Sequence, residues 1–326
     1  MSRDQLPPPG TTLADLGEFG VIEALTRGFA QGADVLLGPG DDAAVVAVDG
    51  GRVVVSTDVL VDGRHFRRDW ASASDVGHRA AGQSLSDLNA MGGRTTGIVV
   101  GLAAPADLEV AWLLDLGRGL AEECALVGAS VVGGDLTRSE VLTICVTALG
   151  VVEGEPLRRD GARAGDVVAL RGRQGWAAAG LAVLGRGFRS PRAVVEAYRR
   201  PEIQYGGGAE AVAAGATSLV DVSDGLLADL GHVAAASGVV VDLRSEAFVV
   251  DEPLRAVGAA LGVDPLTFVL GGGDDHALAG TFPSGTELPA GWTRIGEVLD
   301  AGEGAPEHRV TVDGAAYEGA TGFRHF

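Results

Sequence analysis

The chain has 326 residues, of which 46% are hydrophobic and 21% are charged, and its formal net charge is −19 at pH 7. These values indicate a globular protein of about two domains with a substantial core. The negative charge disfavours nucleic acid as a partner, because binding a phosphate backbone requires clustered Lys and Arg. No apolar run reaches the roughly 20 residues of a membrane helix, and the N-terminus does not resemble a signal peptide.

The two cysteines, Cys124 and Cys145, lie in apolar surroundings without metal-ligand spacing or a disulfide framework. Thiols of this kind are typical of proteins in a reducing compartment. We therefore expect a cytoplasmic protein with neither nucleic-acid nor membrane partners.

The periodicity of apolar residues predicts a mixed α/β (α+β) fold in two domains, residues 1–153 and 154–326, with a Gly- and Pro-containing linker at 153–165. For the first domain we expect helix 13–30, a hairpin of strands 43–48 and 53–57 around residues 49–51, helix 74–91, strand 95–103, helix 106–127, and strands 129–133 and 141–152. For the second we expect strand 166–170, helices near 175–185, 191–198, 206–215 and 224–237, and strands near 217–222, 239–243, 276–282 and 294–298.

Five short acidic motifs place an aspartate at the boundary of an apolar element or facing one. They are Gly38-Pro39-Gly40-Asp41-Asp42-Ala43-Ala44, Ser56-Thr57-Asp58, Ser84-Leu85-Ser86-Asp87, Gly133-Gly134-Asp135 and Asp221-Val222-Ser223-Asp224-Gly225. Mg²⁺ prefers hard oxygen ligands, and proteins usually hold it with one or two carboxylates together with substrate phosphates. Strand ends position carboxylates rigidly, and a neighbouring glycine lets phosphate oxygens approach the backbone. The motifs therefore predict binding of Mg²⁺ and phosphate.

A purely structural interpretation competes for each motif taken alone. Asp-Gly and Gly-Asp are common turn dipeptides, and Asp87 could belong to a solvated helix face. Ser223 is expected to cap the helix that follows it, whose N-terminus can then face a phosphate. Together the five motifs favour cation binding. The chain has no P-loop and no protein-kinase signature, so another scaffold must bind any nucleotide.

The stretches around these motifs resemble the thiamine-monophosphate kinase family, of the superfamily that includes aminoimidazole ribonucleotide synthetase. The matching segments follow the family order and cover residues 38–44, 56–66, 85–92, 133–138, 159–166, 221–226, 272–276 and 322–326. The resemblance implies ATP- and Mg²⁺-dependent phosphorylation of thiamine monophosphate to thiamine diphosphate. It also implies a homodimer whose N-terminal domains, which hold metal and ATP, pair their sheets, while the C-terminal domain completes the active site.

The resemblance also assigns roles to individual residues. Several Mg²⁺ ions would be held by Asp42, Ser56, Thr57, Asp58, Asp87, Asp135, Asp221 and Asp224. ATP would contact Gly134, Asp135, Arg159 and Ser223, and thiamine monophosphate would contact His65, Asp274 and Phe323. Asp42 is preferred over Asp41 because only one of two successive side chains faces inward in an extended segment.

The chain departs from the family pattern in its second half. The family motif there reads Gly-Gly-Glu-Asp-Tyr-Glu-Leu. This chain has Asp274, His276 and Ala277 in place of the first Glu, the Tyr and the second Glu. The shorter Asp274 puts its substrate contact in question. Arg64, next to His65, could add positive charge near the acceptor phosphate.

The acceptor would itself be a phosphate monoester, whose second pKa of about 6 leaves it largely ionised at neutral pH. No residue is therefore assigned as a general base, and the task of the site is to neutralise and align two polyanions. We expect direct in-line transfer without a phosphoenzyme.

Two other functions remain open at this stage. One is a superfamily reaction in which ATP activates an amide, or a selenium or carbamoyl donor. The relatives that activate selenium or carbamoyl donors carry a reactive cysteine near one terminus, which this chain lacks. The other is a non-catalytic metal- or nucleotide-binding protein, which the altered region around Asp274 supports best.

Overall fold

The computed structural model describes residues 7–37, 45–48, 52–302 and 309–323. Asp42, predicted as a Mg²⁺ ligand, and the predicted turn 49–51 lie outside the described residues. The contacts divide the chain into two compact units, which are treated separately below: an N-terminal unit of Met1–Leu88 and Arg94–Glu153, and a C-terminal unit of Asn89–Gly93 and Gly154–Phe326.

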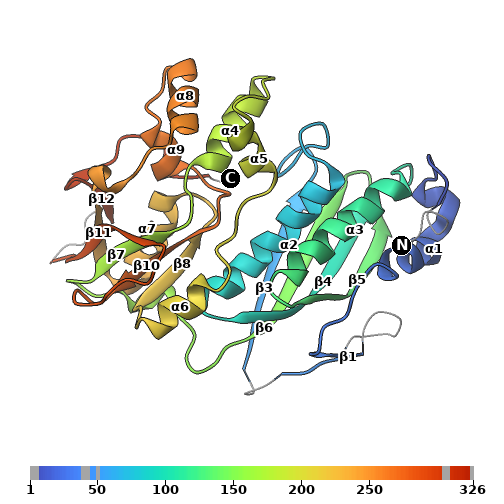
Figure 1. Ribbon diagram of the computed structural model, residues 1–326, viewed down its shortest axis with the longest axis horizontal. Helices are drawn as coiled ribbons and strands as arrows, with labels where there is room; N and C mark the ends of the chain where they lie inside the picture. The colour runs from blue at the N-terminus through green and yellow to red at the C-terminus, as the bar shows by residue number, and fades with distance from the viewer. Residues whose placement is uncertain (1–6, 38–44, 49–51, 303–308, 324–326) are drawn as a thin grey trace. The chain divides into compact units, whose positions relative to one another are not determined.

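The N-terminal unit is built on a four-stranded sheet with helices on one side (Figure 1). In this sheet β6 is antiparallel to β3 and β4, whereas β4 and β5 are parallel and are connected through α3. The strands, in spatial order, are β3 (Val53–Val61), β6 (Thr143–Val151), β4 (Arg94–Ala104) and β5 (Ser130–Arg138). The helices are α1 (Leu13–Thr26), α2 (Ala73–Ala90) and α3 (Val110–Ala125), and a separate small sheet pairs β1 (Val35–Leu37) with β2 (Val45–Val46).

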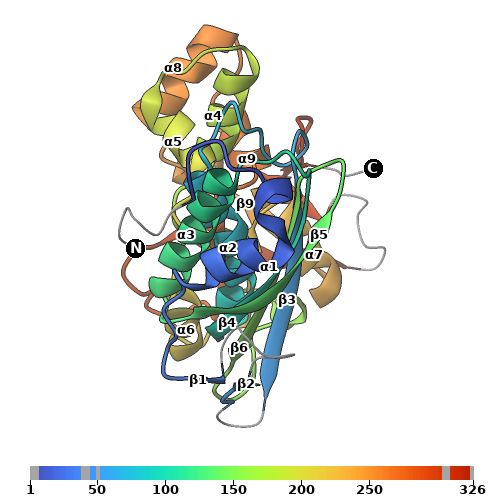
Figure 2. The same cartoon turned by 90° about the vertical axis from the view of Figure 1, so that its right-hand side faces the viewer.

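The two faces of the four-stranded sheet differ in what covers them. Helices α2 and α3 lie on one face, and Figure 2 shows the sheet and these helices from the side. Leu60, Ile98 and Ile144 are buried on this helix-covered face. Successive side chains of a strand point to opposite faces, and Val55 and Val59 on β3 are 59% and 47% exposed. The face that carries Val55 and Val59, which no described helix covers, is called the open face below.

Helices α2 and α3 approach each other more closely than ordinary side chains allow. A Cβ atom on Gly77 would lie 2.2 Å from the carbonyl oxygen of Leu116, and one on Gly119 would lie 2.2 Å from that of Ser74. Glycine is required at both positions, because any Cβ there would overlap with backbone. The close contact helps to fix α2 on the sheet, with Gln83, Ser84 and Asp87 facing β3.

The C-terminal unit contains a seven-stranded sheet whose neighbouring strands are antiparallel, except for β12 and β9. In spatial order the strands are β13 (Ala315–Ala316), β12 (Val310–Val312), β9 (Val239–Leu243), β11 (Trp292–Asp300), β7 (Val167–Arg171), β10 (Ala277–Phe282) and β8 (Ser218–Val222). The helices are α4 (Trp176–Gly185), α5 (Arg192–Arg199), α6 (Gly207–Ala213), α7 (Leu226–Ser237), α8 (Glu252–Leu261) and α9 (Leu266–Gly271), with short 3₁₀ turns at Arg159–Gly161 and Ser245–Ala247.

Helices pack on both faces of this sheet, which explains why its central strands are almost continuously apolar. On one face α7 covers β8 and β9, and its Leu226 and Leu230 join Val241 in the main core cluster. On the other face Phe282 and Trp292 meet edge to face, with ring centroids 5.2 Å apart. β8 is therefore held rigidly, and the site residues that follow it begin from a fixed position.

The structure confirms the predicted mixed α/β fold and corrects parts of the element assignment. The predicted hairpin of strands 43–48 and 53–57 is wrong, because β2 pairs with β1 and β3 pairs with β6. β5 extends to Arg138, five residues beyond its predicted end, because pairing with β4 continues past the two glycines. Helices α8 and α9 and the short strands β1, β12 and β13 were not predicted. No described helix has the length and apolar character to cross a membrane.

Candidate active site

The N-terminal unit gathers three of the predicted metal ligands on the helix-covered face. Ser56 and Asp58 project from β3 toward α2, and the Ser56 hydroxyl donates a hydrogen bond to the Asp87 carboxylate. Ser84 Oγ donates to Asp58 Oδ2 at 2.6 Å, and Gln83 Nε2 lies 3.5 Å from Asp58 Oδ1. These bonds fix both carboxylates against the sheet.

Ser84 and Gln83 are site residues that the sequence analysis did not assign. Ser84 was part of the third motif, but it was not given a role. Residue 87 follows residue 84 by three positions and residue 83 by four. On a helix these spacings put it on the same face as both. That spacing was the available signal.

Thr57 and Asp135 lie on the open face, away from this group. The Thr57 hydroxyl is 3.0 Å from Thr147 Oγ1 and donates to the Val146 carbonyl at 3.2 Å. Asp135 is in the same row across the sheet as Gly101, Cys145 and Val59. Three strand spacings separate it from β3, roughly 14 Å.

The structure thus brings together only part of the predicted set in this unit. Within the described part of the N-terminal unit, Ser56, Asp58 and Asp87 come together, whereas the side chains of Thr57 and Asp135 do not join them. The physical reason is strand alternation: adjacent residues such as Thr57 and Asp58 must point to opposite faces.

Gly134, predicted to contact ATP, has a packing role of its own. A Cβ atom at this position would lie 2.2 Å from the carbonyl oxygen of Val100 on the neighbouring strand. Glycine is thus required for β4 and β5 to pair here, whether or not a phosphate approaches. Its contact with ATP remains a prediction.

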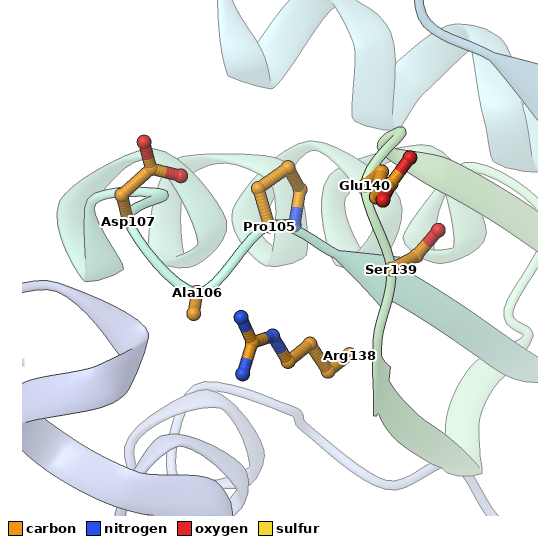
Figure 3. A pocket seen from close by; sticks show the side chains of 6 residues that line it. All are labelled: Pro105, Ala106, Asp107, Arg138, Ser139 and Glu140. Atoms are coloured by element: carbon orange, nitrogen blue, oxygen red, sulfur yellow. The ribbon is translucent and has the colours of Figure 1, made fainter.

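A hollow lies where the parallel strands β4 and β5 end, at an edge where α/β sheets often bind ligands. It is lined by Pro105, Ala106, Asp107, Arg138, Ser139 and Glu140. Figure 3 shows the Arg138 side chain reaching beneath Ala106, while the Asp107 carboxylate points away from it. Arg138 ends the fourth matching segment and forms no ion pair with any residue in the described ranges.

In the C-terminal unit, three segments distant in sequence meet around the end of β8. Asp221 lies in β8, and Ser223 and Asp224 follow it. The Asp274 N–H donates to the Ser223 carbonyl at 2.8 Å, and the Phe323 N–H donates to the Asp224 carbonyl at 2.9 Å. Two backbone hydrogen bonds thus hold four predicted site residues together, and Asp221 lies two residues before the first of them.

Gly225 allows these segments to come so close. Its φ is +142°, and a Cβ atom there would lie 2.8 Å from the Gly271 carbonyl oxygen and 3.1 Å from Gly322 Cα. An L side chain would be strained by the backbone conformation and would also collide with both neighbouring segments. The Asp-Gly pair of the fifth motif is therefore required by packing as well as by its turn.

Asp229, which the sequence analysis did not assign, holds the turn after β8. Its Oδ2 accepts the N–H groups of Asp224 and Gly225, each at 3.0 Å. The predicted capping role of Ser223 is wrong: α7 begins after Gly225, and the Asp229 carboxylate satisfies the N–H groups instead. The pKa of Asp229 is raised to about 7, mainly by burial and also by the negative charges of Asp221 and Asp224, while the N–H bonds from Gly225 and Asp224 lower it.

Asp275 holds a second turn, at the start of α4. It is 5% exposed, and its Oδ1 accepts the Ala177 N–H at 2.9 Å. Burial raises the pKa of Asp275 to about 7, although hydrogen bonds from the N–H groups of Ala177 and Gly175 oppose the rise. Gln174 adds a bond from its side-chain amide to the Gly272 carbonyl at 2.5 Å. The turn before α4 is thereby fastened to the segment that carries Asp274.

Two predicted ligand contacts lie elsewhere in their units. In the N-terminal unit, His65 is in the turn after β3, where its Nδ1 accepts the Val61 N–H at 3.0 Å. In the C-terminal unit, Arg159 is exposed, and its carbonyl accepts a bond from Ser237 at the end of α7. Since the 12 residues of α7 span roughly 18 Å, Arg159 and Ser223 cannot contact the same phosphate group.

Two acidic clusters result: Ser56, Asp58 and Asp87 in the N-terminal unit, and Asp221 and Asp224 in the C-terminal unit. Their donor atoms suit Mg²⁺, because they are carboxylate and hydroxyl oxygens. Within the described ranges no three or more His, Cys, Asp or Glu side chains are arranged to hold a metal ion alone. Mg²⁺ usually takes one or two carboxylates and completes its shell with water and phosphate oxygens. The mutual repulsion of Asp221, Asp224 and Asp229, which contributes to the raised pKa of Asp229, would be relieved by a cation.

Comparison with known proteins shows which proteins this chain resembles in sequence and fold. The family model described as AIR synthase related protein, N-terminal domain, matches residues 40–152. The thiamine-monophosphate kinase of Mycobacterium tuberculosis is 47% identical over 317 residues, which cover 97% of this chain and 93% of the relative. A solved thiamine-monophosphate kinase from Stenotrophomonas maltophilia K279a has a TM-score of 0.76 at 33% identity, over 91% of this chain and 95% of that one. A structure described as AaThiL complexed with AMPPCP and TMP has a TM-score of 0.75 at 30% identity, over 98% and 100% of the two chains.

The chain therefore has an AIR synthase-like fold, with an AIR synthase related N-terminal domain over residues 40–152. Within this group, the chain belongs to the thiamine-monophosphate kinase family.

The raised pKa of Asp275 predicts a measurable pH dependence of stability. Between its unfolded value of 3.8 and about 7, the folded state holds a proton that the unfolded state releases. This stabilisation is fully present below pH 3.8 and is lost as the pH rises toward 7. We expect the Asp275→Asn variant to lose this pH dependence. The free energy of unfolding of the variant minus that of the original chain should therefore rise by roughly 2–4 kcal/mol between pH 5 and pH 8.

Urea unfolding at several pH values measures the effect, and Asp107→Asn at an exposed carboxylate serves as the control. If the curves of the Asp275→Asn variant and the original chain run parallel, Asp275 is ionised throughout and the assignment is wrong.

Proposed function

We propose that this protein transfers the γ-phosphoryl group of ATP to thiamine monophosphate, yielding thiamine diphosphate and ADP in thiamine diphosphate biosynthesis. The observation that carries the proposal is the 47% identity to a thiamine-monophosphate kinase over nearly the whole chain. The structural likeness to AaThiL complexed with AMPPCP and TMP supports the same pair of substrates, an ATP analogue and the acceptor. Both clusters present oxygen ligands of the kind that this transfer requires.

Several Mg²⁺ ions would be held by the acidic residues of the two units. Bound Mg²⁺ supplies neutralisation of the phosphate charges that otherwise keep ATP and the acceptor apart. In the N-terminal unit Asp58 and Asp87 are anchored by hydroxyl donors, and in the C-terminal unit Asp224 is anchored through its backbone by Asp229. These anchors support their assignment as ligands, because bound carboxylates must be oriented before the metal arrives. Asp42, Asp135 and Thr57 are retained as proposed ligands from the family alone.

Recognition of the substrates would fall to residues outside these carboxylates. Arg159 is exposed and forms no ion pair with the part of the chain described here, which suits a contact with a nucleotide phosphate. The ring of Phe323 is 55% exposed beside Asp224 and offers a flat apolar surface for the thiamine rings. Asp274 and His65 would contact the acceptor, and Gly134 and Ser223 would contact ATP.

The acceptor needs no base, because its phosphate oxygen is already largely ionised at neutral pH. We therefore propose direct in-line transfer, in which this chain holds the acceptor phosphate and the γ-phosphate of ATP in line with each other. An ATP made chiral at the γ-phosphorus tests the step. We expect the configuration to invert, whereas retention would indicate a phosphoenzyme and would contradict the proposal.

The function itself is tested with purified protein, ATP and Mg²⁺. We expect thiamine diphosphate and ADP from thiamine monophosphate and no product from unphosphorylated thiamine. Asp58→Asn and Asp221→Asn should each lower turnover about 100-fold or more, because each removes a carboxylate proposed to hold the Mg²⁺ that neutralises the phosphate charges. Asp251→Asn, at an exposed carboxylate with no assigned role, serves as the matched control. Absence of ADP with every acceptor would favour a non-catalytic metal- or nucleotide-binding protein instead.

We further propose that the protein is a cytoplasmic homodimer that packs through the open face of the four-stranded sheet. On β3 this face carries Val53, Val55 and Val59, which are 49%, 59% and 47% exposed. A row of exposed valines on a strand favours an apolar partner surface, and the second copy of a homodimer presents the same row. The presence of Thr57 and Asp135 on this face would bring further oxygen ligands close to the interface.

Val55→Asp should convert the dimer to monomer, because it places a charge at the centre of the proposed apolar contact. Analytical ultracentrifugation at micromolar concentration measures the change, and Val249→Asp, at a residue 85% exposed in the C-terminal unit, is the control. A Val55→Asp variant that stays dimeric would show that the interface lies elsewhere.

A further inference from the structure

The only side-chain hydrogen bond that Asp221 makes with the described residues comes from a histidine with no assigned role. His276 Nδ1 lies 3.1 Å from Asp221 Oδ2. Both residues are buried, with exposed fractions of 1% for His276 and 4% for Asp221. His276 occupies the position at which the family motif has tyrosine.

The direction of this hydrogen bond follows from the chemistry of its partners. An ionised carboxylate only accepts hydrogen bonds, so the proton must be carried by His276 Nδ1. A ring nitrogen donating to a carboxylate fixes both the ring orientation and the rotation of the carboxylate. Asp221 Oδ2 is therefore occupied by the histidine, whereas Oδ1 has no hydrogen-bond partner among the described residues.

The backbone holds His276 in an unusual conformation that turns its ring toward β8. The φ of His276 is +52°, and that of Asp274 is +66°, values that residues other than glycine rarely adopt. The His276 N–H donates to the Val222 carbonyl at 3.1 Å, and the Asp274 N–H donates to the Ser223 carbonyl at 2.8 Å. Strained conformations of this kind persist where surrounding contacts require them, and they cluster at functional sites.

The geometry points to a positioning role: we propose that His276 orients the Asp221 carboxylate through its Nδ1–H bond and leaves Oδ1 as the metal ligand. This inference rests on the proposed function, because it takes Asp221 as a Mg²⁺ ligand. Asp224 and Asp229 are close enough for their charges to act together with that of Asp221. Without a donor on Oδ2, the Asp221 carboxylate would be free to rotate away from a cation and from these neighbours.

His276→Phe and His276→Asn test the role. Phenylalanine keeps a ring and removes the donor, whereas the asparagine amide can donate from about the position of Nδ1. We expect His276→Phe to weaken Mn²⁺ binding to the substrate-free protein about tenfold, the lower end of losses caused by removing a partner of a metal ligand. His276→Asn should recover most of that loss. Electron paramagnetic resonance of free Mn²⁺ measures both, and the exposed His232→Phe is the control.

A second measurement does not depend on any variant folding. Nitrogen-15 NMR of the metal-free original chain should show the buried histidine protonated at Nδ1. An Nε2–H tautomer, or equal Mn²⁺ affinity in the folded His276→Phe variant and the original chain, would overturn the inference. Equal loss in the Phe and Asn variants would also contradict it, because the role requires the donor.

These outcomes are separable from those of the kinase assay. A chain that phosphorylates thiamine monophosphate but binds Mn²⁺ independently of His276 would refute the positioning role alone. A chain without kinase activity under any condition would refute the proposed function, whatever the tautomer of His276.

Discussion

Two buried carboxylates hold the turns next to the candidate site of the C-terminal unit by accepting hydrogen bonds from backbone N–H groups. Asp229 binds the turn after β8, and Asp275 binds the turn before α4. Each carboxylate lies in surroundings that oppose its ionisation, and the pKa of each is raised to about 7. Such groups persist where their hydrogen bonds fix the backbone that carries ligands. Asp221 is placed by β8 itself, whereas the positions of Asp224, Asp274 and Phe323 depend on these two turns.

The N-terminal unit reaches the same result with hydroxyl groups. The Ser84 hydroxyl on α2 holds Asp58, and the Ser56 hydroxyl on β3 holds Asp87. Gly77 and Gly119 let α2 and α3 pack without intervening side chains, which supports the helix that carries Ser84 and Asp87. The sheet then presents two chemically different faces, one with anchored carboxylates beneath helices and one with exposed valines. A single unit can thus provide a ligand site and an apolar contact surface without mixing them.

Much of the fold and part of the site could be predicted from the sequence. Amphipathic periodicity located helices such as α2 and α7, since one period repeats over many residues. The acidic motifs around Asp58, Asp87 and Asp221 were recognised because five such motifs in one chain are harder to explain as ordinary turns than any one of them alone. Asp229 and Gln83 were missed, since each lies inside a helix pattern where its residue type is unremarkable. The hairpin of β2 and β3 was predicted wrongly, because a turn signal says nothing about which strand is the better partner.

The amino-acid sequence alone determined the order of the elements, the kinds of side chain at the site and, through its long matching stretches, the family. Only the tertiary structure decided which aspartates share a face and which segments meet. Thr57 and Asp58 are neighbours in the chain but point to opposite faces, whereas Asp221 and His276 are far apart in the chain and form a hydrogen bond. The physical reason is that strand order and register are set by pairing between distant segments, and a shift of one residue reverses the face of every side chain.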